Sequence, residues 1–178
     1  MADIPSTHHL VSADFLTPSY RIVGKIHVPH TGLLAFMNDP TSSFIEVQEA
    51  KLARTHMPTK LAGEYKMIDV VKANIFAVCL TRLEDVGSVA QKHSGNSKIN
   101  QYPIRVTTPV YEVEGTLEWT GRFDFESIMV AGKRDFAPVY DAVVTAILIQ
   151  NFRIESPALL FNRHMVDLLA RPKEENGI

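Results

Sequence analysis

The sequence predicts a mainly β protein made of two tandem, related small β-barrel or β-sheet modules packed together, with at most short helices. The first observation behind this prediction is the segment "YRIVGKIHV" (20–28), in which apolar and polar side chains alternate. Alternation with a period of two is typical of a strand with one buried face. The second observation is a similar segment, "YEVEGTLEW" (111–119), which has Tyr and Gly at the same positions. The third is that more matches follow in the same order along both halves of the chain.

These further matches predict an internal duplication. A Thr-Gly pair comes after each of the two strands. The segment "FIEVQEAKL" (44–52) aligns with "FAPVYDAVV" (136–144), and "VVKANIFAV" (70–78) lies near the position of "LFNRHMVDL" (160–168). The separation between matching residues stays between 89 and 92 positions. An ordered series at nearly constant separation is what a copied segment with small loop insertions would leave.

The duplication also sets the predicted boundaries. The segment "KHSGNSK" (92–98) is polar, rich in Gly and Ser and without hydrophobic periodicity, which indicates an exposed linker. The alternating segment "YPIRVTTPV" (102–110) predicts an extra strand before the second module. The predicted organisation is an N-terminal tail at 1–19, module one at 20–83, a linker with the extra strand at 84–110, module two at 111–170 and a C-terminal tail at 171–178.

Most segments within the modules are expected to be extended. The alternating "FIEVQEAKLAR" (44–54) predicts a half-buried strand, and the β-branched run "DAVVTAILIQNF" (141–152) predicts a strand buried on both faces. "MIDVV" and "NIFAVCL" suggest a hairpin that turns at 72–73. The choice between helix and strand stays open for 61–80 and for 156–171. In the second of these, Ser156 and the proline after it fit the start of a helix.

The composition favours a globular protein with an ordinary core. The chain has 178 residues, of which 46% are hydrophobic, so global disorder is not expected. A formal net charge of −2 argues against a nucleic-acid binder with a strongly basic surface. Cys79 is the single cysteine, which excludes an internal disulfide, and its apolar neighbours predict a buried thiol.

No membrane partner is expected. The first residues lack a basic segment followed by an apolar one, and the longest apolar run, "AVVTAILI" (142–149), is far too short to span a bilayer. A cytoplasmic protein is therefore predicted.

Charge is divided unequally between the two predicted modules. Residues 20–83 contain eight Lys or Arg against five Asp or Glu, whereas residues 111–170 contain five against nine. The formal charges are thus +3 and −4. Opposite signs fit modules that attract each other, within a chain or between chains, and they also fit random variation on solvated faces. A homo-oligomer is expected from the first interpretation.

Three segments resemble Sm-like barrels and uncharacterised bacterial proteins with duplicated small β-modules. They are the glycine-bearing strand "VEGTLEW", the acidic-Ala strand "YDAV" and the final hairpin "LFNRHMVDL", which carries Asn and basic residues. The resemblance implies contacts to RNA from the turn before the last strand. The matching positions in this chain are Lys72 and Asn74 in module one, and Asn162 and Arg163 in module two.

Candidate catalytic or metal-binding residues are few. His27 and His30 are three residues apart, but Pro29 breaks the strand between them. Asp124 and Glu126 alternate with phenylalanines, so both would face the same side of a strand, where they would either bind a metal or lie in solvent. The chain contains no nucleophile elbow, phosphate loop or dinucleotide fingerprint, and no cofactor is predicted.

Two functional hypotheses follow. The preferred one is a non-enzymatic binding or assembly protein that recognises a protein, a small ligand or a short nucleic acid through its loops. The alternative is a metal-dependent or acid–base enzyme in which folding brings His27, His30, Asp124 and Glu126 together.

Overall fold

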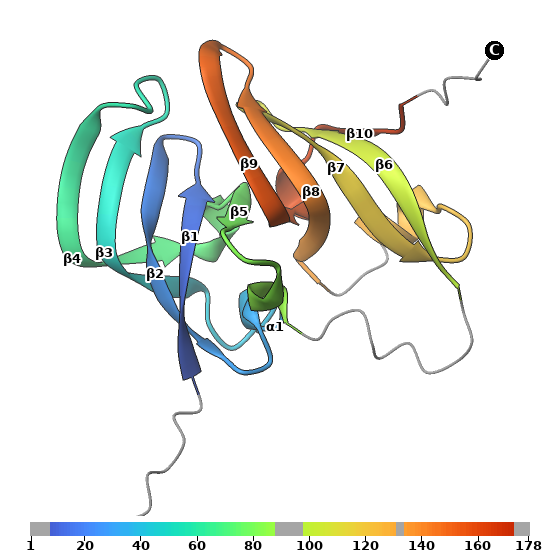
Figure 1. Ribbon diagram of the computed structural model, residues 1–178, viewed down its shortest axis with the longest axis horizontal. Coiled ribbons are helices and arrows are strands. Elements are labelled where there is room, and N and C mark those ends of the chain that lie inside the picture. Colours follow the sequence, from blue (N-terminus) through green and yellow to red (C-terminus); the bar gives the residue numbers. More distant parts are fainter. Residues whose placement is uncertain (1–7, 88–97, 131–133, 173–178) are drawn as a thin grey trace, which may run out of the picture.

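The structure is a computed structural model that describes residues 8–87, 98–130 and 134–172. Within these residues the chain forms one antiparallel sheet of ten strands and two short α-helices (Figure 1). The prediction of a mainly β protein with at most short helices is confirmed at this level. Neighbouring strands across the sheet follow the order β10-β6-β7-β8-β9-β5-β1-β2-β3-β4.

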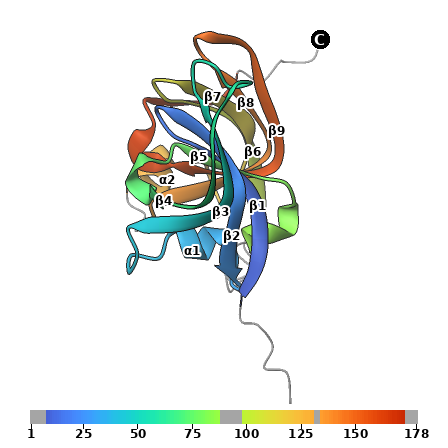
Figure 2. The same ribbon diagram turned by 90° about the vertical axis from the view of Figure 1, so that its left-hand side faces the viewer.

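The described residues fall into a first half, 8–87, and a second half, 98–172, with the same order of elements. The first half contains β1 (His8–Leu16), β2 (Tyr20–Pro29), α1 (Leu33–Met37), β3 (Phe44–Arg54), β4 (Leu61–Val71), a 3-10 turn (Lys72–Asn74), β5 (Ala77–Leu80) and a second 3-10 turn (Leu83–Val86). The second half contains β6 (Ile99–Thr107), β7 (Tyr111–Thr120), α2 (Phe125–Met129), β8 (Phe136–Ala146), β9 (Ile149–Asn162), a 3-10 turn (Arg163–Met165) and β10 (Leu168–Ala170). Figure 2 looks at the first half from its outer side, with α1 near the lower end of the strands.

The two halves meet where β5 pairs with β9 in the middle of the sheet. Alternate residues of both strands enter two different hydrophobic clusters. Val78 of β5 and Leu160 of β9 lie in the cluster of the first half, whereas Cys79 and Leu159 lie in that of the second. All four are buried. Because successive side chains of a strand point to opposite faces, a strand between two cores must be apolar at every position, and this explains the unbroken runs "AVCL" and "ALLF".

A glycine allows β2 to cross β3 closely. The β2–β3 ladder shifts register at Gly24, and Glu49 on the opposite strand has a φ of 50°. A Cβ on Gly24 would lie 2.4 Å from Val47 Cγ1 and 2.9 Å from the carbonyl oxygen of Gln48. No side chain fits there, because real Cβ atoms essentially never approach other atoms so closely. The bulge increases the bend of the sheet at this point.

The second half has the same arrangement. The β7–β8 ladder shifts register at Gly115, and Asp141 has a φ of 48°. A Cβ on Gly115 would lie 2.4 Å from Val139 Cγ1 and 2.8 Å from the carbonyl oxygen of Tyr140. A left-handed residue opposite a glycine therefore bends the sheet at the matching place in each half.

Several predicted elements need correction. Residues 8–16 of the predicted tail form β1, whose alternate residues Val11, Ala13 and Phe15 are buried. No hairpin forms at 72–73, because β5 pairs with β1 and β9 and not with β4. The run 141–152 is interrupted by a turn in which Leu148 is 89% exposed, so it is not one buried strand.

The two ambiguous segments are extended. Residues 61–80 contain β4 and β5, and residues 156–171 contain the end of β9, a 3-10 turn and β10. Ser156 does not begin a helix; its hydroxyl donates to the carbonyl oxygen of Leu80 at 2.8 Å and accepts from the Leu80 N–H at 3.0 Å.

The extra strand predicted at 102–110 corresponds to β6. Residues 88–97 of the predicted linker, and 173–178 of the predicted C-terminal tail, lie outside the described residues. None of the described helices is long and apolar enough to cross a membrane.

We expect Gly24→Ala to lower the free energy of unfolding by about 2 kcal/mol, because overpacking against Val47 and the β3 backbone forces the strands apart. Urea denaturation followed by circular dichroism measures this change. The matched control is Gly63→Ala, where the atoms nearest to the added Cβ belong to the exposed, rotatable ring of Tyr65. The control should change stability by about 0.5 kcal/mol or less. Equal stabilities of the two variants would contradict the close crossing at Gly24.

Candidate functional site

Lys72, one of the four residues suggested by the Sm-like resemblance, is buried. Its Nζ donates to the carbonyl oxygens of Phe36 at 3.0 Å and Asp39 at 3.2 Å, and it lies 5.3 Å from the centre of the Phe36 ring. Burial lowers the pKa of Lys72, while the nearby carboxylates of Asp39 and Asp135 act in the opposite direction. The side chain thus satisfies the carbonyls at the end of α1.

Arg163 occupies the corresponding place in the second half. Its Nη1 donates to the carbonyl oxygen of Ile128 in α2 at 2.8 Å, and its backbone N–H donates to the backbone carbonyl oxygen of Asp135 at 2.8 Å. Burial lowers the pKa of Arg163. Asn162 is also buried, and its Oδ1 accepts from the backbone N–H of His164 at 3.0 Å. Of the four suggested residues, only Asn74 has an exposed side chain, and contact to RNA stays a prediction.

The residues of the enzyme hypothesis lie on different elements in different halves. His27 is exposed on β2, and the ring of His30 stacks on that of His9 with centroids 5.8 Å apart. Asp124 and Glu126 are not on a strand, because Asp124 is the N-cap of α2 and accepts from the Glu126 N–H at 3.1 Å. Over the ranges that the structure describes, no three His, Cys, Asp or Glu residues gather in a way that could hold a metal ion.

Asp124 and Cys79 are two more ionisable residues whose surroundings are typical of structural and not of catalytic residues. The Ser127 hydroxyl donates to Asp124 at 2.6 Å and lowers the pKa of that carboxyl group. Cys79 is fully buried on β5, and burial raises the pKa of its thiol. A buried thiol with a raised pKa is a poor nucleophile, because the thiolate is the reactive form.

The two outer edges of the sheet, β4 and β10, are candidate interaction surfaces. Within the described chain, β4 pairs only with β3 and β10 only with β6. Met67 on β4 is 54% exposed, whereas Ala158 at the matching position of β9 is fully buried. Leu168 on β10 is 54% exposed, whereas Ala77 at the matching position of β5 is 3% exposed. Unpaired edges with exposed apolar residues are prone to pair with another strand.

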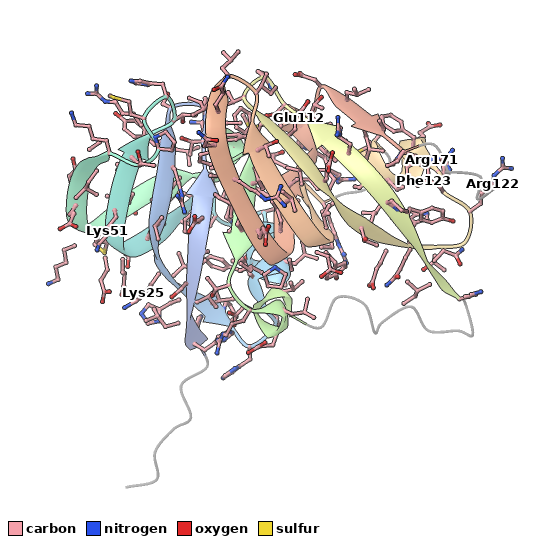
Figure 3. The ribbon with its side chains drawn as sticks, turned by 45° about the horizontal axis from the view of Figure 1, so that its top comes forward. Lys25, Lys51, Glu112, Arg122, Phe123 and Arg171 are labelled. Atoms are coloured by element: carbon pink, nitrogen blue, oxygen red, sulfur yellow. The ribbon has the colours of Figure 1, made fainter. Side chains whose placement is uncertain are left out.

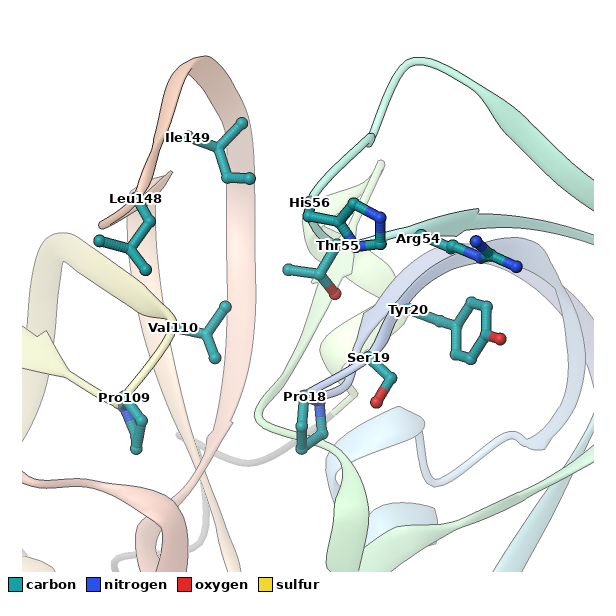
Figure 4. A pocket seen from close by; sticks show the side chains of 10 residues that line it. All are labelled: Pro18, Ser19, Tyr20, Arg54, Thr55, His56, Pro109, Val110, Leu148 and Ile149. Carbon is teal, nitrogen blue, oxygen red and sulfur yellow. The ribbon is translucent and has the colours of Figure 1, made fainter.

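A cleft of about 490 Å³ between the two halves is the other candidate site (Figure 4). Turns at matching places of both halves form its walls, with residues 18–20 and 54–56 on the first half and residues 109–110 and 148–149 on the second. In the first half, the Thr55 N–H donates to the Ser19 carbonyl at 2.9 Å. In the second half, the Ile147 N–H donates to the Val110 carbonyl at 2.9 Å. Each wall is therefore a pair of turns held together by a backbone hydrogen bond.

The turns themselves have a threonine in common. The Thr17 hydroxyl donates to the Tyr20 carbonyl and accepts from the Tyr20 N–H, both at 3.0 Å. Thr108 makes the same pair of bonds with Tyr111, at 3.2 and 2.9 Å. The signal for this site was present in the sequence as "TPSY" and "TPVY", which the sequence interpretation did not use.

Contacts next to the cleft join the two halves. Tyr111 is buried, packs edge-on against Phe76 with ring centroids 5.7 Å apart, and donates its hydroxyl to Thr55 Oγ1 at 3.4 Å. Burial raises the pKa of the Tyr111 phenol. Tyr111 comes from the second half, whereas Phe76 and Thr55 come from the first, and Thr55 also lines the cleft, so these contacts connect the two halves beside it.

Comparison with models of known protein families, with curated proteins and with solved structures found no match.

We expect Lys72→Met to lower the free energy of unfolding by about 1–3 kcal/mol, because it leaves the carbonyls of Phe36 and Asp39 without their donor. The measurement is denaturant unfolding at pH 7. Lys66→Met is the matched control, since Lys66 lies on the edge strand β4 with an exposed side chain. A Lys72 variant as stable as the control would mean that this cation is not a structural cap.

Proposed function

We propose that the chain is a tandem pair of related small β-modules, distantly akin to Sm-like barrels, and that it is a non-enzymatic assembly protein whose copies join edge to edge. In each contact, β4 of one copy pairs with β10 of the next copy. The observation that carries this proposal is the β5–β9 junction inside the chain. That junction already joins the two kinds of edge that are free at the ends of the sheet.

The equivalence of the edges follows from their neighbours. β4 pairs with β3 as β9 pairs with β8, and β10 pairs with β6 as β5 pairs with β1. β4 therefore leaves unpaired the edge that corresponds to the one by which β9 pairs with β5. In the same way, β10 leaves unpaired the edge that corresponds to the one by which β5 pairs with β9. The internal junction is a template for pairing the two.

The template also predicts a register for the contact between copies. Inside the chain, Val78 of β5 lies opposite Leu160 of β9. At a separation of 91 residues, the counterpart of Val78 is Leu169 on β10, and the counterpart of Leu160 is Asp69 on β4. The same register would set Leu169 of β10 opposite Asp69 of β4. Arg171 would then lie diagonally across from Asp69 on the same face, within reach of an ion pair.

Electrostatics favour this head-to-tail direction. The predicted modules carry formal charges of +3 and −4, and each β4–β10 contact places the basic half of one copy against the acidic half of another. Figure 3 shows Lys51 on the first half and Arg171 with Phe123 at the opposite end of the molecule. A symmetric contact between two β4 edges or two β10 edges would bring like charges together.

A contact between two different edges generates more than a dimer. Each copy has one edge of each kind, so association continues until a ring closes or a filament forms. Met67 and Asp69 on β4, and Leu168 and Leu169 on β10, would gain neighbours from the adjoining copy at each step. The preferred function is therefore that of a scaffold built from many copies.

We expect the full-length protein to be a higher oligomer, and Asp69→Lys to raise the dissociation constant of the contact by about tenfold through repulsion of Arg171. Light scattering after size exclusion, over a range of concentrations, measures this. The double variant Asp69→Lys with Arg171→Asp should restore assembly. Glu84→Lys is the matched control, since it makes the same charge change on an exposed residue away from β4.

A monomeric wild-type protein at high concentration would contradict the proposal. So would a charge swap that fails to restore assembly. The register is tested by a chain carrying both Asp69→Cys and Leu169→Cys, which should form a ladder of disulfide-linked multimers, since directly opposite strand residues meet the distance requirement of a disulfide. Dimers from the Asp69→Cys variant alone would indicate a symmetric β4 contact instead.

A further inference from the structure

The two walls of the cleft match in backbone structure but differ in chemistry. Each half supplies the same two turns, held by the same hydrogen bond between them. The side chains at matching positions differ. Ser19 in the first half corresponds to Val110 in the second, Arg54 corresponds to Ala146, and His56 corresponds to Leu148. One wall is therefore polar with a permanent positive charge, and the other is apolar.

The positive charge on the polar wall has no partner among the described residues. The Arg54 guanidinium makes no hydrogen bond or ion pair within 8–87, 98–130 and 134–172. Arg54 lines the cleft, and Figure 4 shows its side chain extending past His56 and over Tyr20, away from the opposite wall. Of the other described arginines, Arg21, Arg82, Arg105 and Arg153 each pair with a carboxylate. Arg122 and Arg134 form no ion pair with the described residues either, but unlike Arg54 they do not line the cleft. Arg54 thus offers a planar, multiply donating cation to an incoming anion.

The opposite wall presents apolar side chains to solvent. Leu148 is 89% exposed at the tip of the β8–β9 turn, and Pro109 and Val110 line the same side. When a ligand covers exposed apolar groups next to a concave surface, the free energy of binding becomes more favourable. The change is roughly proportional to the apolar area removed from water. The wall therefore suits a hydrocarbon or aromatic body.

We propose that the cleft binds a small organic anion with an apolar body, of which a medium-chain carboxylate is the simplest form. The carboxylate pairs with Arg54, with the Ser19 hydroxyl as a further donor on the same wall. The hydrocarbon chain lies against Val110 and Leu148. A volume of about 490 Å³ falls within the range of small-molecule sites and accommodates a chain of this size.

The binding geometry is already formed in the free protein. The Tyr111–Thr55 hydrogen bond and the packing of Tyr111 against Phe76 connect the two halves beside the cleft. A ligand then loses less free energy to ordering of the protein. The site also depends on both halves, since neither half alone has both a cationic and an apolar wall.

The test is isothermal titration calorimetry of the full chain with octanoate and, as a charge control, octylammonium. Octanoate should bind and octylammonium should not. Arg54→Gln should weaken octanoate binding by about tenfold or more. Arg153→Gln, which removes an exposed arginine outside the cleft, should leave it unchanged.

The apolar wall is tested in the same assay. Leu148→Ser should weaken octanoate binding by about fivefold, whereas Ile147→Ser, an equal change at a neighbouring exposed residue that does not line the cleft, should not. Circular dichroism of each variant verifies that it is folded. Equal binding of the two amphiphiles, or an Arg54→Gln variant with wild-type affinity, would overturn the proposal. Binding to anionic vesicles without binding of octanoate would also overturn it, because it would identify the exposed turn as a membrane contact.

Discussion

The pairing of β5 with β9 is the interaction on which the rest of the structure depends. Both strands lie between two hydrophobic clusters, and their successive residues alternate between them. Removing either strand would expose apolar surface of both clusters at once, so the two halves are held together by shared core strands and not by a surface contact. The same pairing brings matching turns of the two halves face to face across the cleft. It also determines which kinds of edge remain free at the two ends of the sheet.

The two halves have the same backbone features but different side chains. Each has a glycine crossing opposite a left-handed acidic residue, a threonine-stabilised turn, and a buried cation that caps a short helix. These features maintain the bend and the turn geometry, so they tolerate little change. The residues at the tips of the turns carry no such constraint. Arg54 and His56 in one half against Val110 and Leu148 in the other make the cleft chemically asymmetric, and the proposed preference for an anion with an apolar body rests on this difference.

Much of the fold could be predicted from the sequence because strand alternation is a local property. The pairs Gly24–Gly115 and Glu49–Asp141 also lie where the alignment of the two segments places them. The partners of β5 could not be predicted in this way. Its four apolar residues fit a hairpin with β4 as well as a central position, and the choice depends on contacts with β9, about 80 residues away. A similar limit applies to 141–152, where composition alone predicted a strand buried on both faces although the run contains a turn.

The candidate sites were harder to predict than the fold. Lys72 and Arg163 look like surface cations in sequence, and their burial is decided by the carbonyls of α1 and α2, helices that the sequence did not indicate. Asp124 and Glu126 were placed on a strand because they alternate with aromatics, but Asp124 begins a helix. The cleft arises from turns that are distant in the chain, so no single segment signals it.

One junction, β5 against β9, holds both halves in a single cooperative unit. Native-state hydrogen exchange measures this most directly. The ladder amides of 77–80 and 158–161 should be among the slowest to exchange and should open only when both halves unfold, with a free energy equal to that of global unfolding. Fast exchange at these amides, while the amides of β2 and β7 stay protected, would contradict it.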